Sequence, residues 1–123
     1  TKNPIYCTSL GKAILAYTDE ELRKQVISRV KFERKTARTI VSRLELNQNL
    51  EEIRRLGYAV DDREMEEHMK CVGAPVFASD GSVLGAISVA SLYKPEENYT
   101  VLGQAVAKKA AEVSKLLGFL GKI

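Results

Sequence analysis

The stretch Cys71-Val-Gly-Ala-Pro-Val-Phe77, followed after a short turn by Val83-Leu-Gly-Ala-Ile-Ser-Val-Ala90, decides the fold of this chain. Two apolar runs flank the turn Ser79-Asp-Gly-Ser82, which is the pattern of an antiparallel β-hairpin. With Asp80-Gly81 at the tip, the pattern predicts four facing pairs: Cys71 with Ala90, Gly73 with Ser88, Pro75 with Ala86, and Phe77 with Leu84.

One face of this hairpin carries small residues at its open end. Side chains alternate across a sheet, so the paired residues share a face, on which Gly73, Ser88 and Ala90 lie beside Cys71. The result would be a hollow floored by a hydroxyl and a thiol, which suits a small polar ligand. The same residues would also let a helix pack closely, and the pattern alone leaves both interpretations open.

Length and composition indicate one globular domain over residues 1–123, with 45% hydrophobic and 28% charged residues. No apolar run approaches the ~20 residues of a membrane span, and no signal-peptide pattern opens the chain. The two cysteines, Cys7 and Cys71, lack the short spacing of a disulfide scaffold or a structural zinc site. We therefore expect a cytoplasmic protein.

The net charge of +3 is small, and the basic residues alternate with acids. The densest basic segment, residues 29–38, holds five cations and Glu33. Such a segment attracts phosphate without reading base edges, so we expect no operator recognition by this chain alone.

Apolar periodicity predicts an α+β fold with helices flanking an antiparallel or mixed sheet. The expected strands are 5–8, 58–61 and the hairpin. The expected helices begin at Thr8 or Ser9, at the capping box 18–21, near residue 47, and at residue 100, the last running to 117. Their expected buried residues are Leu10, Ala13, Ile14 and Tyr17; Leu22, Val26, Ile27 and Val30; Leu46, Leu50 and Ile53; and Val101, Leu102, Ala105, Val106, Ala110, Val113 and Leu117.

Residues with reactive side chains are few. Gly11-Lys12 resembles the end of a phosphate-binding loop, but Tyr6 stands where that loop needs its first glycine, so we expect no nucleotide and no other cofactor. Cys71 could be the nucleophile of a cysteine-dependent enzyme, with Asp61 or His68 as helper. Asp61, His68 and Cys71 could also bind a metal, although their spacing matches no strong zinc pattern.

Several stretches together resemble the effector-binding domain of IclR-type bacterial transcriptional regulators. They are Cys7-Thr-Ser-Leu-Gly-Lys-Ala-Ile-Leu-Ala16, Thr36-Ala-Arg-Thr-Ile40, Leu50-Glu-Glu-Ile-Arg-Arg-Leu-Gly-Tyr-Ala-Val-Asp61, Arg63-Glu64, Cys71–Phe77, Gly81, Ala86-Ile-Ser-Val89 and the final helix ending near Leu117-Gly118. Each piece is weak alone, but their order and spacing are specific over almost the whole chain.

The resemblance implies a GAF-like domain that binds a small effector, such as a keto acid or sugar acid, and is not an enzyme. It implies a regulator, expected to be a repressor, that forms homodimers or homotetramers and contacts DNA through an N-terminal winged helix-turn-helix absent from residues 1–123. By the same resemblance, the ligand site would comprise Asp61, Cys71, Ser88 and Ala90, with Ser9, Leu10 and Gly11 opposite. Ala90 stands where some members carry a second serine, and His68 where a glycine is common. Backbone N–H groups from Leu10 to Lys12 would hold a ligand carboxylate.

Overall fold

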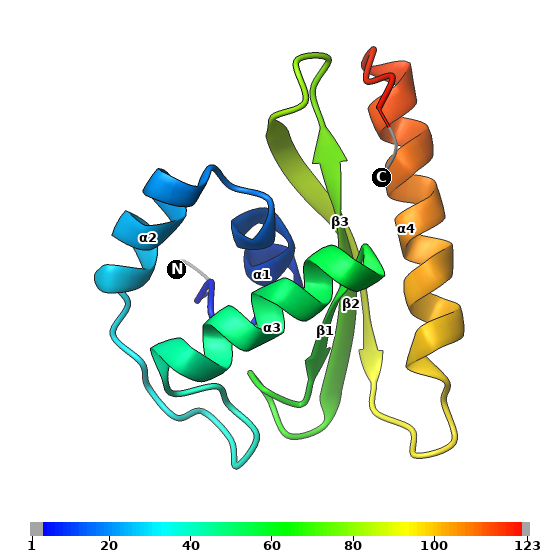
Figure 1. Cartoon of the computed structure of the whole chain (residues 1–123). Coiled ribbons are helices and arrows are strands. Elements are labelled where there is room, and N and C mark those ends of the chain that lie inside the picture. Colours follow the sequence, from blue (N-terminus) through cyan, green and yellow to red (C-terminus); the bar gives the residue numbers. More distant parts are fainter. Residues whose placement is uncertain (1–3, 122–123) are drawn as a thin grey trace.

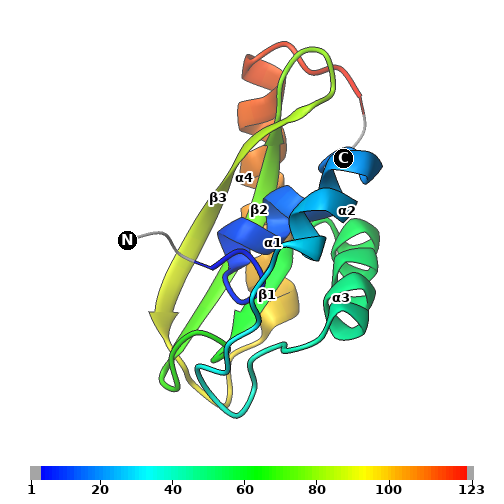
Figure 2. The same cartoon turned by 90° about the vertical axis from the view of Figure 1, so that its left-hand side faces the viewer.

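The computed structural model describes residues 4–121. Within them the elements are α1 (Ser9–Ala16), α2 (Glu20–Ser28), α3 (Arg43–Leu56), β1 (Ala59–Asp62), β2 (Met69–Phe77), β3 (Val83–Leu92) and α4 (Tyr99–Leu116). The strands form one antiparallel sheet in the order β1-β2-β3. Helix α4 covers one face, α1 and α3 lie on the other side, and α2 lies outermost (Figures 1 and 2). The predicted α+β fold is confirmed.

The predicted hairpin register holds for three of its four pairs: Cys71 with Ala90, Gly73 with Ser88, and Pro75 with Ala86. The fourth is wrong, because Phe77 pairs with Val83 after an irregularity between Val76 and Phe77. An extra residue in one strand of a pair makes such a bulge. The turn is closed by Asp80, whose Oδ1 atom accepts from the N–H and hydroxyl of Ser82, and Gly81 supplies a φ of 87°.

The first helix buries a different side from the one that its apolar residues predict. Leu10 and Ile14 are exposed, whereas Ser9, Lys12, Ala13 and Ala16 are buried. The face of α1 that carries small side chains packs against Gly73 of β2. A Cβ atom on Gly73 would lie 3.1 Å from the carbonyl carbon and oxygen of Ser9. Backbone proximity therefore overrides apolar periodicity here.

Three other elements differ from expectation. Residues 5–8 form a turn and no strand, and α2 buries Ile27 while Leu22 is 51% exposed. Helix α3 begins at Arg43, four residues earlier than expected, because Ser42 accepts from the Glu45 N–H as its N-cap. Its predicted buried residues and its end at Gly57, with a φ of 88°, are confirmed.

Helix α4 packs on the sheet through small residues. Its buried positions are Gly103, Val106, Ala110 and Ser114, whereas the predicted inward residues Val101, Ala105, Val113 and Leu117 are exposed. The Tyr58 ring fills the space beside Gly103, and the Ser114 hydroxyl accepts from the Phe77 N–H at 2.9 Å. The small side chains allow close contact, and the serine satisfies a backbone donor at the end of β2.

Candidate functional site

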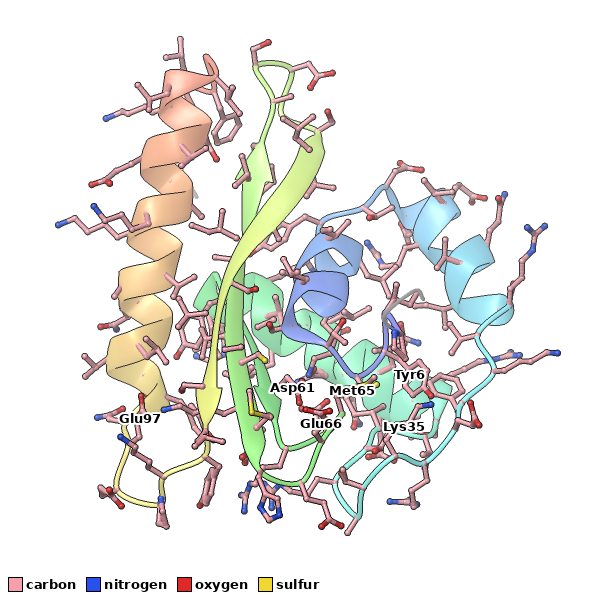
Figure 3. All side chains as sticks on the ribbon, turned by 180° about the vertical axis from the view of Figure 1, so that it is seen from behind. Tyr6, Lys35, Asp61, Met65, Glu66 and Glu97 are labelled. Carbon is pink, nitrogen blue, oxygen red and sulfur yellow. The ribbon has the colours of Figure 1, made fainter. Side chains whose placement is uncertain are left out.

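A cavity of about 350 Å³ opens between the N-terminal end of α1, the β1–β2 loop and the open end of the hairpin. It is lined by Thr8, Ser9, Leu10, Asp61, Met65, Glu66, Met69, Cys71, Ser88 and Ala90. Figure 3 shows Asp61, Met65 and Glu66 gathered at this place. We call it the α1–hairpin cavity. Its size and its mixture of apolar and polar walls suit a small polar ligand.

Six of the seven residues expected to contact a ligand line this one cavity: Ser9, Leu10, Asp61, Cys71, Ser88 and Ala90. Gly11, the seventh, lies outside it, and a Cβ atom there would lie 2.5 Å from the Cα atom of Ile5. Gly11 therefore has a packing role, since it lets the preceding turn fold against α1.

The N-terminus of α1 offers fewer free donors than expected. The Gly11 N–H donates to the Thr8 hydroxyl at 3.2 Å, and the Lys12 N–H donates to the Thr8 carbonyl at 3.0 Å. Both groups are used inside the helix, which corrects the expectation that they face a ligand. The N–H groups of Ser9 and Leu10 belong to the first turn, where a helix has no internal acceptors.

Asp61 is one of two acids that line the cavity, the other being Glu66. Asp61 is 3% exposed, and its Oδ1 atom accepts from the Glu64 N–H at 2.8 Å. Burial raises the pKa of this carboxyl, and the backbone hydrogen bond and the Lys12 charge oppose that shift. A carboxyl in this state can accept from a ligand hydroxyl or, when protonated, donate to a ligand carboxylate.

Behind Asp61 lies a buried ion pair that positions the wall of the cavity. The Lys12 Nζ atom lies 3.0 Å and 3.1 Å from the two carboxylate oxygens of Glu64 and 2.7 Å from the carbonyl oxygen of Val60. Three acceptors match its three N–H donors. The pair fixes α1 against β1 and the loop that follows it.

The same loop is fixed from its other side by two buried threonines. The Thr36 hydroxyl donates to the Arg63 carbonyl at 2.7 Å, and the Thr39 hydroxyl donates to the Glu64 carbonyl at 2.6 Å. Residues 31–39 lie outside the helices and strands, yet these two threonines of the segment are buried. The loop that carries Met65 and Glu66 is therefore held in place by side chains far away in the sequence.

Cys71 lacks the features of a catalytic nucleophile. Burial raises the pKa of its thiol, and the nearby charges of Asp61 and Glu66 raise it further. A thiol needs a lowered pKa or an adjacent base to react as thiolate. His68, one of its two expected helpers, does not line the cavity. No observation favours the enzyme alternative.

The three residues considered as an alternative metal site do not converge. No group of three His, Cys, Asp or Glu side chains in residues 4–121 is placed to hold a metal ion, so Asp61, His68 and Cys71 do not form such a site. The backbone carbonyl of His68 accepts from the Tyr93 N–H at 2.8 Å, which ties its loop to the segment after β3. No helix within the same residues is long and apolar enough to cross a membrane.

Sequence reasoning missed Met65, Glu66 and Met69, which supply much of the cavity wall. Residues 62–69 are rich in acids, a composition typical of a loop in solvent and not of a cavity wall. The two methionines within this segment, Met65 and Met69, are the available signal, because Met fills irregular apolar gaps and is common on adaptable binding surfaces.

Comparison with known proteins finds a matching family model and similar regulators. Residues 1–115 match the family model described as "Bacterial transcriptional regulator IclR C-terminal". The chain is 33% identical over 120 residues to the HTH-type transcriptional regulator KdgR of Escherichia coli (strain K12), a match that covers 96% of this chain and 46% of KdgR. It is 31% identical over 117 residues to the HTH-type transcriptional repressor AllR of the same strain, over 94% of this chain and 43% of AllR.

A solved structure agrees with these matches. The C-terminal domain of E. coli KdgR superposes with a TM-score of 0.87 at 32% identity, over 97% of this chain and 74% of that one. The chain spans less than half the length of the curated relatives described above.

Proposed function

Because the chain belongs to the IclR family of bacterial transcriptional regulators, as an effector-binding domain of the C-terminal type, we propose that the α1–hairpin cavity is its effector site. The effector is a small metabolite such as a keto acid or sugar acid. Its binding changes the affinity of a full-length repressor for DNA in the cytoplasm. The family is one of transcriptional regulators and not of enzymes.

The observation that carries this proposal is the convergence of polar groups from distant parts of the chain on one cavity. Asp61 comes from β1, Cys71 from β2 and Ser88 from β3, and Ser9 and Leu10 lie opposite on α1. A ligand that contacts several elements can favour one arrangement of those elements over another. Such a differential response is what regulation requires.

The chemistry of the walls suggests how each ligand group is held. The first-turn N–H groups of Ser9 and Leu10 would take a carboxylate, helped by the helix dipole. The Ser88 hydroxyl would donate or accept one hydrogen bond, and Asp61 would orient ligand hydroxyls. Cys71 would form part of the apolar wall.

A thermal-shift screen against keto acids, sugar acids and aromatic acids tests the proposal. A ligand at 100 times its dissociation constant adds ~2.7 kcal/mol to the free energy of unfolding. For any ligand found, Ser88→Ala should weaken binding by about 1 kcal/mol if one neutral hydrogen bond is lost. Ser88→Phe should abolish binding by filling the cavity.

The matched control is Val101→Phe, which adds an aromatic ring at an exposed position on α4, outside the cavity. It should bind as the unchanged protein does. Unaltered affinity in both Ser88 variants would place the site elsewhere.

We also propose that the domain self-associates as a homodimer or homotetramer. Strand β3 lies at the edge of the sheet, and its side chains Leu84, Val89 and Leu92 are exposed. Unpaired backbone groups beside exposed apolar side chains favour strand-to-strand association. Light scattering that shows only the 13.6 kDa monomer at high concentration would contradict an interface within this chain.

DNA recognition is assigned to a helix-turn-helix outside this chain. Within the basic segment 29–38, Arg38 pairs with Asp62, Lys35 pairs with Glu33 at 3.5 Å, and Arg34 donates to backbone carbonyls of its own loop. Cations held in this way contribute little to phosphate contact. In a gel-shift assay at 150 mM salt, roughly physiological ionic strength, this chain should show no preference for a promoter fragment over a scrambled one.

A further inference from the structure

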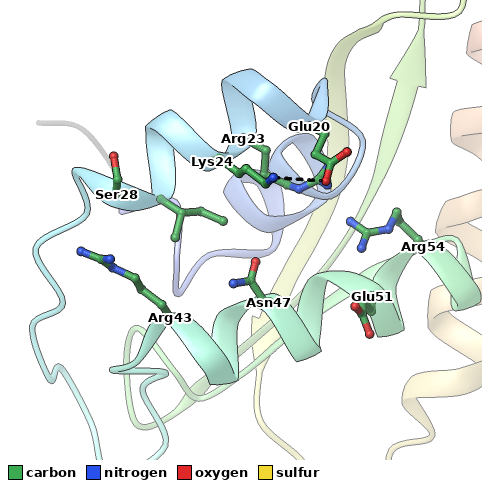
Figure 4. Close-up of a pocket in the computed structure, with 9 residues that line it drawn as sticks. Glu20, Arg23, Lys24, Ser28, Arg43, Asn47, Glu51 and Arg54 are labelled. Atoms are coloured by element: carbon green, nitrogen blue, oxygen red, sulfur yellow. Dashed lines mark ion pairs between the residues drawn. The ribbon is translucent and has the colours of Figure 1, made fainter.

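A second hollow, between α2 and α3, gathers positive charge away from the α1–hairpin cavity (Figure 4). It measures about 380 Å³ and shares no lining residue with that cavity. We call it the basic cleft, because its charged side chains are the cations Arg23, Lys24, Arg43 and Arg54 and the acids Glu20 and Glu51.

Two of the arginines are anchored on the same turn of the chain. The Arg23 Nη1 atom donates to the Thr18 carbonyl at 2.8 Å, and the Arg54 Nη1 atom donates to the Ala16 carbonyl at 3.0 Å. Both acceptors lie where α1 ends and leads into α2. A guanidinium carries five N–H donors, so each anchored group is oriented and keeps donors for another partner.

The acids of the cleft compensate only part of this charge, because four cations face two carboxylates. Glu20 pairs with Lys24 at 3.5 Å, and Glu51 points away from α2 in Figure 4. In the part of the chain that the structure describes, no carboxylate forms an ion pair with Arg23, Arg43 or Arg54.

Arg43 completes the arrangement from the other side of the cleft. It is the first residue of α3, and Figure 4 shows its side chain rising from that helix toward α2. The N-terminus of a helix carries a partial positive charge, so α3 adds to the potential at this end of the cleft.

We propose that the basic cleft binds a compact oxyanion with at least two negative charges, such as a phosphate group or a dicarboxylate. Oriented guanidinium groups match such an anion with paired, charge-assisted hydrogen bonds. Three arginines without an internal counter-ion can neutralise two charges, and a cleft of about 380 Å³ has room for a small anion. The site is separate from the effector cavity and does not depend on it.

The test is an NMR titration of the 123-residue protein with sodium phosphate and, separately, sodium malonate. Sodium chloride at matched ionic strength is the reference. We expect saturable shifts of backbone amides in α2 and the facing side of α3, and the tighter of the two anions identifies the preferred class. Arg43→Gln combined with Arg54→Gln should raise the dissociation constant at least tenfold.

Two further variants make the result decisive. Arg55→Gln, on the same helix but paired with Glu52 outside the cleft, should leave binding unchanged. Arg43→Gln alone does not disturb the anchored arginines and should raise the dissociation constant at least threefold. Shifts that do not saturate, that chloride reproduces, or that all variants share would overturn the proposal.

Discussion

The ammonium group of Lys12 and the carboxylate of Glu64, 52 positions apart in the sequence, form an ion pair in which the lysine side chain is completely buried. Removing one partner of a buried pair leaves the other charge without compensation, which typically costs 3–5 kcal/mol. We expect Lys12→Met to lower the free energy of unfolding by about that amount in urea denaturation.

Adding Glu64→Leu to Lys12→Met should recover much of the loss, because an apolar pair of similar volume avoids the buried charge. The control is Lys24→Met, which breaks the exposed pair with Glu20 and should cost about 0.5 kcal/mol or less. Equal costs for the two lysine variants would contradict the assignment of Lys12 as a buried anchor.

Asp61 should make stability depend on pH. Burial raises the pKa of its carboxyl, so the folded protein holds this proton more tightly than the unfolded chain does. The free energy of unfolding should therefore fall as pH rises from the unfolded-state value of about 3.9 through the folded-state pKa. Asp61→Asn removes the charge, so its stability relative to the unchanged protein should increase across this window and stay higher above it.

Asp80→Asn is a control with the opposite sign. Hydrogen bonds from the Ser82 side chain and backbone hold the pKa of the Asp80 carboxyl below its usual range, which contributes stability that is lost as pH falls. The relative stability of this variant should decrease as pH rises toward the unfolded-state value of about 3.9, below the window of Asp61. Urea denaturation from about pH 2 to 8 covers both windows, and a pH-independent Asp61→Asn difference would contradict the prediction.

Alanine substitution at two glycines should change the free energy of unfolding in opposite directions, because one glycine allows close packing and the other does not. A Cβ atom on Gly103 would lie 2.3 Å from the Cε1 atom of the buried Tyr58 ring, so Gly103→Ala should destabilise the protein by about 1–3 kcal/mol. Gly85 in β3 has nothing within 4 Å of its Cβ position, and Gly85→Ala should stabilise by about 0.5–1 kcal/mol. Thermal unfolding of both variants checks the difference in sign.

The cysteines should react slowly with iodoacetamide at pH 8. Cys7 is completely buried, and burial raises its pKa to about 11. Cys71 is half-buried with a raised pKa, so it should react before Cys7 but more slowly than free glutathione. Both should react alike in denaturant. A Cys71 that outpaces glutathione would revive the enzyme hypothesis.

The hairpin and its register could be predicted because they depend on local chemistry. Asp80-Gly81 specifies the turn, and alternation then determines which residues face each other, including Cys71 and Ser88. The prediction fails only at Phe77, where an irregularity in the strand shifts the pairing register by one residue. Six of the seven expected site residues lie together for the same reason, although their contact with a ligand stays a prediction.

The orientation of α1 could not be predicted, because it depends on partners far away in the sequence. Leu10 and Ile14 suggest an apolar buried stripe, but the close approach at Gly73 and the pairing of Lys12 with Glu64 turn the helix the other way. No local pattern indicates that a lysine will be completely buried. The polar loop that carries Met65 and Glu66 becomes a cavity wall for similar reasons, since it is held by Thr36 and Thr39.

The close approach of Gly73 to Ser9 has a consequence for how ligand preference could change during evolution. A single added methyl group at residue 73 would press on the Ser9 backbone at 3.1 Å, so α1 would have to move outward by a few tenths of an ångström. That movement would widen the α1–hairpin cavity while every side chain that lines it stayed the same. A residue that does not line the cavity could therefore select among ligands by size, so related domains with identical lining residues need not share an effector.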